Sequence, residues 1–229
     1  MPDPWRERRE IRNAVLYLGD CLEILPTLPK VDLMFADPPY NVGLGSMPHA
    51  ARQMGYAGSS DTLLGSEYIQ LLAGCFDLLH GGISAFVTPG NCNQNLWPQP
   101  LWTMAWMKSN GVTRTPLTRG QKMNHACWEP ILVYGKLAFP PISDVLEIPI
   151  SQQFDAEDHP CPKPIRLLNA IISLTDAETI LDPFMGSGTT GVACMNLGRK
   201  FIGIEIEPKY FDIACERIEN AQRQMRMFA

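Results

Sequence analysis

Residues 179–206 constrain the fold of this chain more than any other stretch. The apolar segment Thr179-Ile-Leu-Asp-Pro-Phe184 predicts a buried strand, and Gly186-Ser-Gly-Thr-Thr-Gly191 predicts a tight turn into a helix. A second strand is predicted over residues 200–206, with Glu205 at its end. Buried strands that alternate with helices are typical of a sheet covered by helices on both faces.

The rest of the chain repeats this alternation. We predict further strands over 14–20, 31–36, 83–88 and 128–134, and helices over 21–28, 65–80, 165–172 and from Pro208 onwards. The short connection between the first two strands predicts a β-α-β unit with parallel strands and a right-handed crossover. Because nothing marks a linker between two cores, the pattern predicts a doubly wound α/β sheet in a single domain spanning residues 1–229.

The composition argues against several classes of protein. No apolar run approaches the roughly 20 residues that cross a bilayer, and the first residues are too charged for a signal peptide, so we expect a cytoplasmic protein with no membrane contact. Seven cysteines without a CxxC pair favour reduced thiols and argue against a metal site. The formal net charge of −5 argues against a uniformly basic nucleic-acid binder.

Two clusters of side chains receive ordinary structural interpretations. The tryptophans of residues 94–110 (Trp97, Trp102 and Trp106) are predicted to pack mostly in the core. Residues 108–136 hold five basic side chains against the single acid Glu129, namely Lys108, Arg114, Arg119, Lys122 and Lys136. Such a basic cluster is more often a solvated face than a phosphate-binding site.

The glycine turn and the acid that follows it indicate a cofactor that carries adenosine. Glycines let the backbone approach a ligand closely, and Glu205, 19 residues after Gly186, suits the ribose hydroxyls. The candidates are a nicotinamide or flavin dinucleotide and S-adenosylmethionine. A dinucleotide domain needs several more β-α units after this turn, but only about forty residues follow it. Asp182, just before the turn, also suits a cationic group better than a diphosphate.

A second feature is the end of the strand predicted over residues 31–36. The chain leaves this strand through Asp37-Pro38-Pro39-Tyr40, and the two prolines prevent both further strand pairing and immediate entry into a helix. A carboxylate and an aromatic ring are thereby held on a stiff segment. This arrangement suits the binding of a flat polar ligand, although a plain exit from a strand gives the same pattern.

Together these motifs resemble those of a known family. Asp37-Pro-Pro-Tyr40, His159-Pro-Cys-Pro-Lys-Pro164 and Asp182-Pro-Phe-Met-Gly-Ser-Gly-Thr-Thr190 look like the motifs of the DNA amino-methyltransferases. Their order, with the catalytic motif first and the cofactor motif last, resembles the β class. The resemblance covers residues 14–218 and implies a Rossmann-like class I methyltransferase fold with circularly permuted motifs.

The resemblance implies roles for particular residues. Asp37, Pro38, Pro39 and Tyr40 would form the catalytic motif, with Tyr40 stacked on a flipped-out base. S-adenosylmethionine would be the cofactor, with its methionine end lined by Asp182, Phe184, Gly186, Gly188 and Thr189. Glu205 would bind the ribose and Ile206 would contact the adenine. Asp20 would lie near the same adenine, and Lys163 would face the cofactor carboxylate.

The resemblance also implies a substrate. Double-stranded DNA would be the partner and N6 of adenine the target, because family members with Asp in the first motif position mostly modify adenine. N4-cytosine methylation, methylation of an RNA amine and a catalytically silent nucleic-acid-binding protein stay open as alternatives. A restriction-linked role and a homodimer are further expectations.

Three segments without helix or strand patterns are candidates for DNA contact. Residues 41–61 are rich in glycine and serine and predict a mobile loop near the active site. Residues 113–126 and 137–158 are predicted to be short DNA-contacting segments. The candidate contact residues are Asn41, Arg114, Arg119, Lys122 and Asn124.

Overall fold

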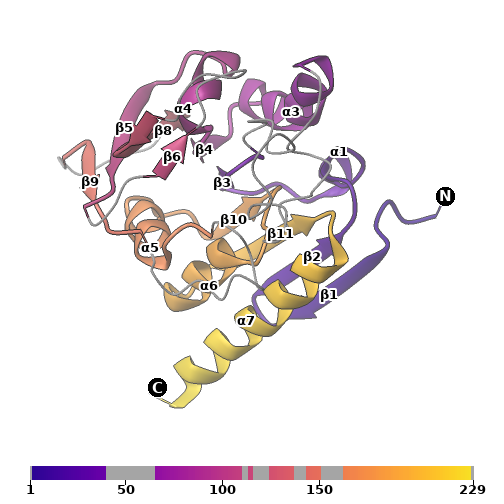
Figure 1. Cartoon of the computed structure of the whole chain (residues 1–229). Coiled ribbons are helices and arrows are strands. Elements are labelled where there is room, and N and C mark those ends of the chain that lie inside the picture. The colour runs from indigo at the N-terminus through magenta and orange to yellow at the C-terminus, as the bar shows by residue number, and fades with distance from the viewer. Residues whose placement is uncertain are drawn as a thin grey trace, which may run out of the picture.

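A computed structural model of the protein describes residues 2–39, 65–109, 113–115, 124–136, 143–150 and 162–227. Its strands are β1 (Glu7–Ile11), β2 (Ala14–Leu18), β3 (Leu33–Ala36), β4 (Ser84–Val87), β5 (Trp102–Met107), β6 (Thr113–Thr115), β7 (Asn124–Ala126), β8 (Trp128–Tyr134), β9 (Val145–Glu147), β10 (Thr179–Asp182) and β11 (Lys200–Glu205). Nine of them form one sheet in the order β1-β2-β11-β10-β3-β4-β8-β5-β9 (Figure 1). β6 and β7 pair separately as an antiparallel ribbon.

The centre of the sheet is parallel, as the sequence predicts. β2, β11, β10, β3 and β4 run in the same direction, whereas β1 and β8 join the two sides of this block in antiparallel pairing. β5 pairs antiparallel to β8, and β9 pairs parallel to β5. The sheet is therefore mostly parallel with an antiparallel extension beyond β4.

Helices cover both faces of this sheet (Figure 1). The helices are α1 (Cys21–Ile24), α3 (Gly65–His80), α4 (Gly90–Asn93), α5 (Ile165–Ser173), α6 (Thr189–Asn196) and α7 (Pro208–Met227), with 3₁₀ turns η1 (Leu25–Thr27) and η4 (Gln94–Leu96). Apolar residues of α5, α6 and α7 pack in one core, and those of α1 and α3 pack in the clusters on the opposite face. This is the doubly wound arrangement that the sequence predicts.

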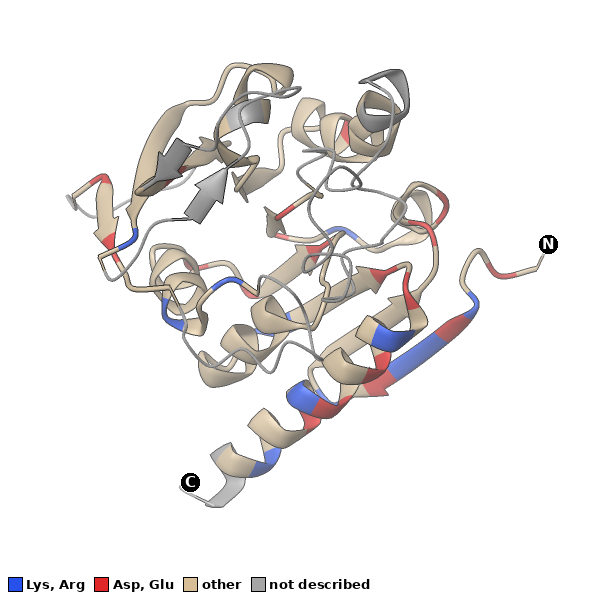
Figure 2. Ribbon diagram, in the orientation of Figure 1, with Lys and Arg blue, Asp and Glu red and all other residues tan. Residues whose placement is uncertain are grey.

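The residues of β3 show why a fully apolar strand lies at the centre. Leu33 and Phe35 pack in the core beneath α5, α6 and α7, whereas Met34 and Ala36 pack in the core beneath α3. Successive side chains of a strand point to opposite faces, so a strand buried on both faces needs apolar residues throughout. Figure 2 shows the same contrast in charge: acidic and basic residues occupy most of β1 and recur along α7, but the central strands are largely uncharged.

Some details of the fold differ from the sequence expectations or add to them. β1 is a charged edge strand that the apolar pattern did not predict, and the helix expected over residues 21–28 is a four-residue helix followed by a 3₁₀ turn with Pro26 at its start. β2 and β3 are parallel but not neighbours, because β11 and β10 lie between them. The tryptophans pack mostly in the core, as predicted: Trp97 and Trp106 are buried, whereas Trp102 is 57% exposed.

The described residues also bear on membrane and metal contacts. None of the helices in the described ranges is both long enough and apolar enough to cross a bilayer. The same ranges hold no group of three or more His, Cys, Asp or Glu side chains arranged to bind a metal ion.

Candidate active site

The site begins where two neighbouring parallel strands end. β3 and β10 pair through Leu33 with Ile180 and Met34 with Leu181, so the residues that follow each strand emerge at the same edge of the sheet. Asp37 follows β3, and the glycine turn follows β10. The prediction that these two motifs lie side by side is confirmed, although they are 145 positions apart in the sequence.

The carboxylate of Asp37 is held by two side chains from distant segments. Thr88, which follows β4, donates its hydroxyl to Asp37 Oδ1 at 2.6 Å. Lys163 Nζ lies 2.6 Å from Oδ1 and 2.7 Å from Oδ2 of the same carboxylate. The structure therefore places Lys163 against the predicted catalytic acid, whereas its predicted contact with a cofactor carboxylate stays a prediction.

Asp182 lies beneath the glycine turn and is 2% exposed. Its two carboxylate oxygens accept hydrogen bonds from Phe184 N at 3.0 Å and from Thr190 Oγ1 at 2.6 Å. Burial raises the pKa of Asp182 to about 7, although both hydrogen bonds act in the opposite direction. This carboxyl group therefore titrates close to neutral pH.

Glu205 ties the end of β11 to the glycine turn. Its Oε2 accepts a hydrogen bond from Gly186 N at 2.8 Å, and its Oε1 accepts bonds from Ile206 N and Glu207 N at 2.9 and 2.8 Å. Burial raises the pKa of Glu205, and these backbone donors oppose the shift. The acid predicted to bind ribose thus also fixes the position of the turn.

The glycines of the turn have two different functions in the fold. Gly186 and Gly188 both have positive φ values, 52° and 79°, which side chains of L residues rarely tolerate. A Cβ on Gly188 would lie 2.8 Å from Ala214 Cβ, and one on Gly191 would lie 2.4 Å from Ile218 Cδ1. The last two glycines therefore allow α6 to pack closely against α7, and Gly186 is the glycine that faces the cavity.

One cavity, partly open to solvent, joins the two motifs. Of the residues predicted from the sequence, it is lined by Asp37, Lys163, Asp182, Phe184, Gly186 and Thr189. Five further lining residues were not predicted, namely Phe35, Pro162, Met185, Ser187 and Thr190. Ser187 and Thr190 belong to the glycine motif itself, so the motif was a sufficient signal for them.

Other predicted site residues lie outside this cavity or outside the described residues. Asp20 caps α1, with its Oδ1 accepting a hydrogen bond from Leu22 N at 2.9 Å, and Ile206 is 51% exposed beyond β11. The described backbone places Arg114 in β6 and Asn124 in β7. Tyr40, Asn41, Arg119 and Lys122 lie outside the described residues, as do residues 41–61 and most of 137–158.

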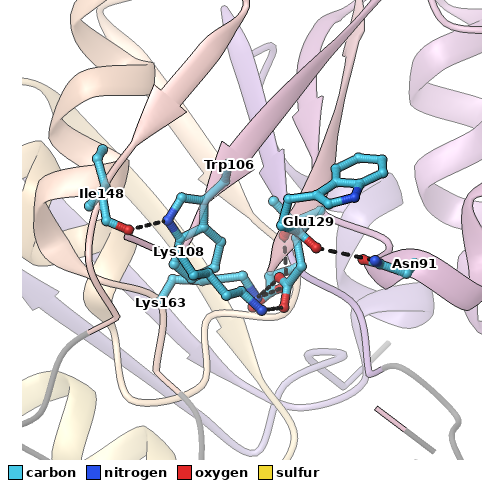
Figure 3. Close-up of polar contacts among 9 residues, drawn as sticks. Asn91, Trp106, Lys108, Glu129, Ile148 and Lys163 are labelled. Atoms are coloured by element: carbon cyan, nitrogen blue, oxygen red, sulfur yellow. Dashed lines mark hydrogen bonds and ion pairs between the residues drawn. The ribbon is translucent and has the colours of Figure 1, made fainter. Parts of the chain in front are cut away.

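Two features of the site were missed by sequence reasoning. Arg217 of α7 donates Nη1 to the carbonyl and the hydroxyl of Ser187, at 2.6 and 2.7 Å, and so supports the glycine turn from below. Lys108 was assigned to a solvated basic cluster, but it is 5% exposed and paired with Glu129 (Figure 3). Neither residue belongs to a motif, and only the packing of distant elements brings them to the site.

The fold and the site together define the class of this protein. The structure combines a doubly wound sheet with an aspartate after one central strand, a glycine turn after the next and an acid at the end of a third. This is the class I methyltransferase arrangement. Comparison with known proteins agrees. Residues 91–216, more than half of the chain, match the family model N6_N4_Mtase, described as DNA methylase. The chain belongs to this family, the DNA amino-methyltransferases of the β class.

Individual relatives are similar over different lengths. The chain is 53% identical to the Type II methyltransferase M2.DpnII of Streptococcus pneumoniae over 66 residues, which are 28% of this chain and 25% of that protein. It is 27% identical over 252 aligned positions to the Type II methyltransferase M2.LlaDCHI of Lactococcus lactis subsp. cremoris, covering 95% of this chain and 93% of that protein.

Two solved structures show the same fold. The M1.HpyAVI–SAM complex has a TM-score of 0.58 and 26% identity, with 88% of this chain and 98% of that chain covered. The PvuII DNA methyltransferase, which is cytosine-N4-specific, has a TM-score of 0.66 and 18% identity, with 96% of each chain covered. The predicted class I fold is thereby confirmed.

Proposed function

We propose that the protein transfers a methyl group from S-adenosylmethionine to the exocyclic N6 amino group of adenine in double-stranded DNA. The observation that carries this proposal is the shared cavity, in which Asp37 and the glycine turn face each other at the ends of β3 and β10. Membership of the DNA methylase family supplies the reaction class. The cofactor supplies a methyl group that its sulfonium has already activated.

The residues of the turn fit this cofactor. Gly186 lines the cavity without a Cβ, so a ligand can approach its backbone closely. Its positive φ is a conformation that residues with a Cβ rarely adopt. The buried carboxylate of Asp182 beneath the turn suits a ligand with positive charge. We assign the methionine end to Asp182, Phe184, Gly186 and Thr189, and the adenosine end to Glu205, Ile206 and Asp20.

Asp37 is the residue that acts on the target amine. The nitrogen of an aromatic amine is a poor nucleophile because its lone pair is delocalised into the ring. Asp37 Oδ and the Pro38 carbonyl each accept one amine hydrogen in our proposal, which favours a tetrahedral nitrogen with its lone pair directed at the methyl group. A carboxylate is too weak a base to deprotonate a neutral amine, but it can accept a proton once the nitrogen is cationic.

The remaining assignments concern DNA. Tyr40 is proposed to stack on the flipped-out base, since an amine inside a duplex cannot reach the cavity. Asn41, the region of residues 113–126 and the segment 137–158 are proposed to contact the duplex, within a single domain that spans the whole chain. Adenine rather than cytosine is supported by Asp37 itself, because relatives that carry serine in this motif position mostly modify cytosine.

Nucleoside mass spectrometry tests the proposal directly. The protein is incubated with isotopically labelled S-adenosylmethionine and amplified, unmethylated DNA of mixed sequence, because the recognition site is unknown, and the digested nucleosides are then separated. We expect labelled N6-methyladenine. Labelled N4-methylcytosine would overturn the choice of base, label only in an RNA control would overturn the choice of polymer, and no label in any sample would support a silent nucleic-acid-binding protein.

A further inference from the structure

Lys108 and Glu129 form a buried ion pair outside the three motifs named in the sequence. Lys108 directly follows β5 and Glu129 lies in β8, and their side chains are only 1% and 12% exposed. Lys108 Nζ contacts Glu129 Oε1 and also lies 5.1 Å from the centre of the Trp106 ring. Apolar residues of similar size stabilise a core at least as well as a buried ion pair, so packing alone gives no reason for these charges.

The pair extends to the predicted catalytic acid through Lys163. Lys163 Nζ lies 3.9 Å from Glu129 Oε2 and 2.6 Å from Asp37 Oδ1, so its ammonium lies between two carboxylates. Each oxygen of Glu129 therefore faces a different lysine (Figure 3). The result is a chain of alternating charges, which we call the ion-pair chain, formed by Lys108, Glu129, Lys163 and Asp37.

Two members of the ion-pair chain, Lys108 and Glu129, are held by hydrogen bonds and strand pairing in the sheet. Glu129 lies opposite Trp106 in the β5–β8 pairing, and the Trp106 indole donates to the carbonyl of Ile148 at 2.7 Å. The backbone N–H of Lys108 donates to the carbonyl of Cys127 at 2.8 Å. Lys163 instead lies in the irregular segment before α5. Glu129 is therefore held within the sheet, whereas the backbone of Lys163 belongs to no helix or strand.

The geometry creates a competition at Asp37. Lys163 donates to both carboxylate oxygens of Asp37, and these are the oxygens that the target amine must reach. An ordinary charge-assisted hydrogen bond is about 2.8 Å long, so a movement of roughly 1 Å would bring the ammonium from its present distance into full contact with Glu129. Such a movement keeps the Lys163 ammonium paired with a carboxylate while the Asp37 oxygens accept the amine hydrogens, with Thr88 still donating to Oδ1.

We propose that Glu129, held by Lys108, is a positioning residue for methyl transfer. The Lys163 ammonium contacts both Glu129 and Asp37, and it moves closer to Glu129 when the target amine binds to Asp37. This inference rests on the proposed function. Lys108 serves the same step indirectly, because it fixes the carboxylate of Glu129 through Oε1 and leaves Oε2 directed at Lys163.

Two variants separate positioning from structural support. Glu129→Gln is expected to lower kcat on the order of 10- to 100-fold, with the dissociation constant for S-adenosylmethionine within twofold of the wild type. If Glu129 served only to neutralise Lys108, the double variant Lys108→Met/Glu129→Gln would regain activity. We expect the double variant to stay as slow as Glu129→Gln, and recovery of kcat would overturn the proposal.

Controls and a second readout keep the test independent of folding and of turnover. Glu219→Gln breaks the exposed pair with Arg223 and should leave kcat unchanged. Glu129→Asp keeps the charge and should give an intermediate kcat. Lysine ammonium signals in ¹H–¹⁵N NMR spectra of the ligand-free protein, assigned with Lys163→Met, report the contact directly. The Lys163 signal should shift in Glu129→Gln, and an unmoved signal would contradict the proposal.

Different outcomes refute the methyltransferase activity and the positioning role of Glu129. A wild-type protein that methylates no base would refute the proposed function, but the NMR spectra would still decide whether Glu129 holds Lys163. A wild-type protein that methylates DNA together with a fully active Glu129→Gln variant would refute the positioning role alone.

Discussion

The two corners of the cavity are built in opposite ways. The glycine turn is made mostly by its own short segment: Asp182 holds Phe184 and Thr190, and Glu205 of the next strand holds Gly186. The Asp37 corner is assembled from side chains that come from four separate parts of the chain, namely Thr88, Lys108, Glu129 and Lys163. One corner is local backbone geometry, and the other is a meeting of distant charges.

This difference indicates a division of labour. A backbone turn on a buried acid is rigid and suits a ligand of constant shape, such as a cofactor. Charged side chains from separate elements can exchange partners, which suits a substrate that must enter, react and leave. Changes at the two corners should therefore affect different steps of the reaction.

Asp37→Ala should have the largest effect and should break the transfer step alone. Loss of the group that accepts the amine hydrogen is expected to lower the single-turnover rate by about 10³-fold or more, because a positioned acid–base group contributes roughly 10²- to 10⁴-fold. Binding of S-adenosylmethionine, measured by calorimetry, should change less than threefold. Asp32→Asn is the matched control, since Asp32 lies before the same strand and accepts backbone bonds from Glu178 and Thr179. Equal losses in both variants would contradict the assignment.

Glu205→Ala should show the opposite profile. It removes the acceptor of three backbone N–H groups, so we expect the free energy of unfolding to fall by about 2–4 kcal/mol. Cofactor binding should weaken by roughly 10- to 100-fold, because the variant loses both the support of the turn and the predicted ribose contact. Chemical denaturation and calorimetry measure the two effects. An unchanged dissociation constant would show that Glu205 is structural only.

The pH dependence of cofactor affinity tests the charge of Asp182. With a pKa of about 7, this group is mainly ionised above neutral pH and mainly protonated below it. A cationic ligand favours the ionised form, so affinity should fall as the pH is lowered, by about tenfold between pH 8 and pH 6. Calorimetry at constant ionic strength measures this. Asp182→Asn should bind weakly at both pH values, and a wild-type affinity that rises on acidification would contradict the sign.

Arg217→Met should give the smallest effect. It tests whether the hydrogen bonds from Arg217 help to hold the glycine turn in the conformation that binds the cofactor. The variant loses the bonds to the Ser187 carbonyl and hydroxyl, and we expect cofactor binding to weaken about threefold to tenfold with little change in the chemical step. Arg223→Met on the same helix is the control, because Arg223 is 72% exposed and pairs only loosely with Glu219. A fall in kcat without a change in cofactor affinity would contradict this prediction, because Arg217 would then affect the chemical step and not cofactor binding.

Sequence reasoning succeeded where a feature depends on neighbours in the chain. The buried strands, the turn at Gly186 and the helix from Pro208 follow from periodicity and from glycine and proline chemistry, and the structure contains all three. It failed where a charge pattern suggested one environment and packing created another. Lys108 counted as one of five basic residues on a solvated face, yet Glu129 makes it a buried member of the site.

The sequence by itself determined the α/β class, the two motifs and the acids Asp37, Asp182 and Glu205 at the ends of apolar strands, because these depend on local backbone preferences and on which residues avoid water. Only the tertiary structure decided that β10 lies beside β3, and that Lys163 lies on Asp37 with Glu129 behind it. The physical reason is one of range. Turn and strand preferences act over a few residues, whereas an ion pair depends on two side chains that the chain brings together only when the whole sheet has formed.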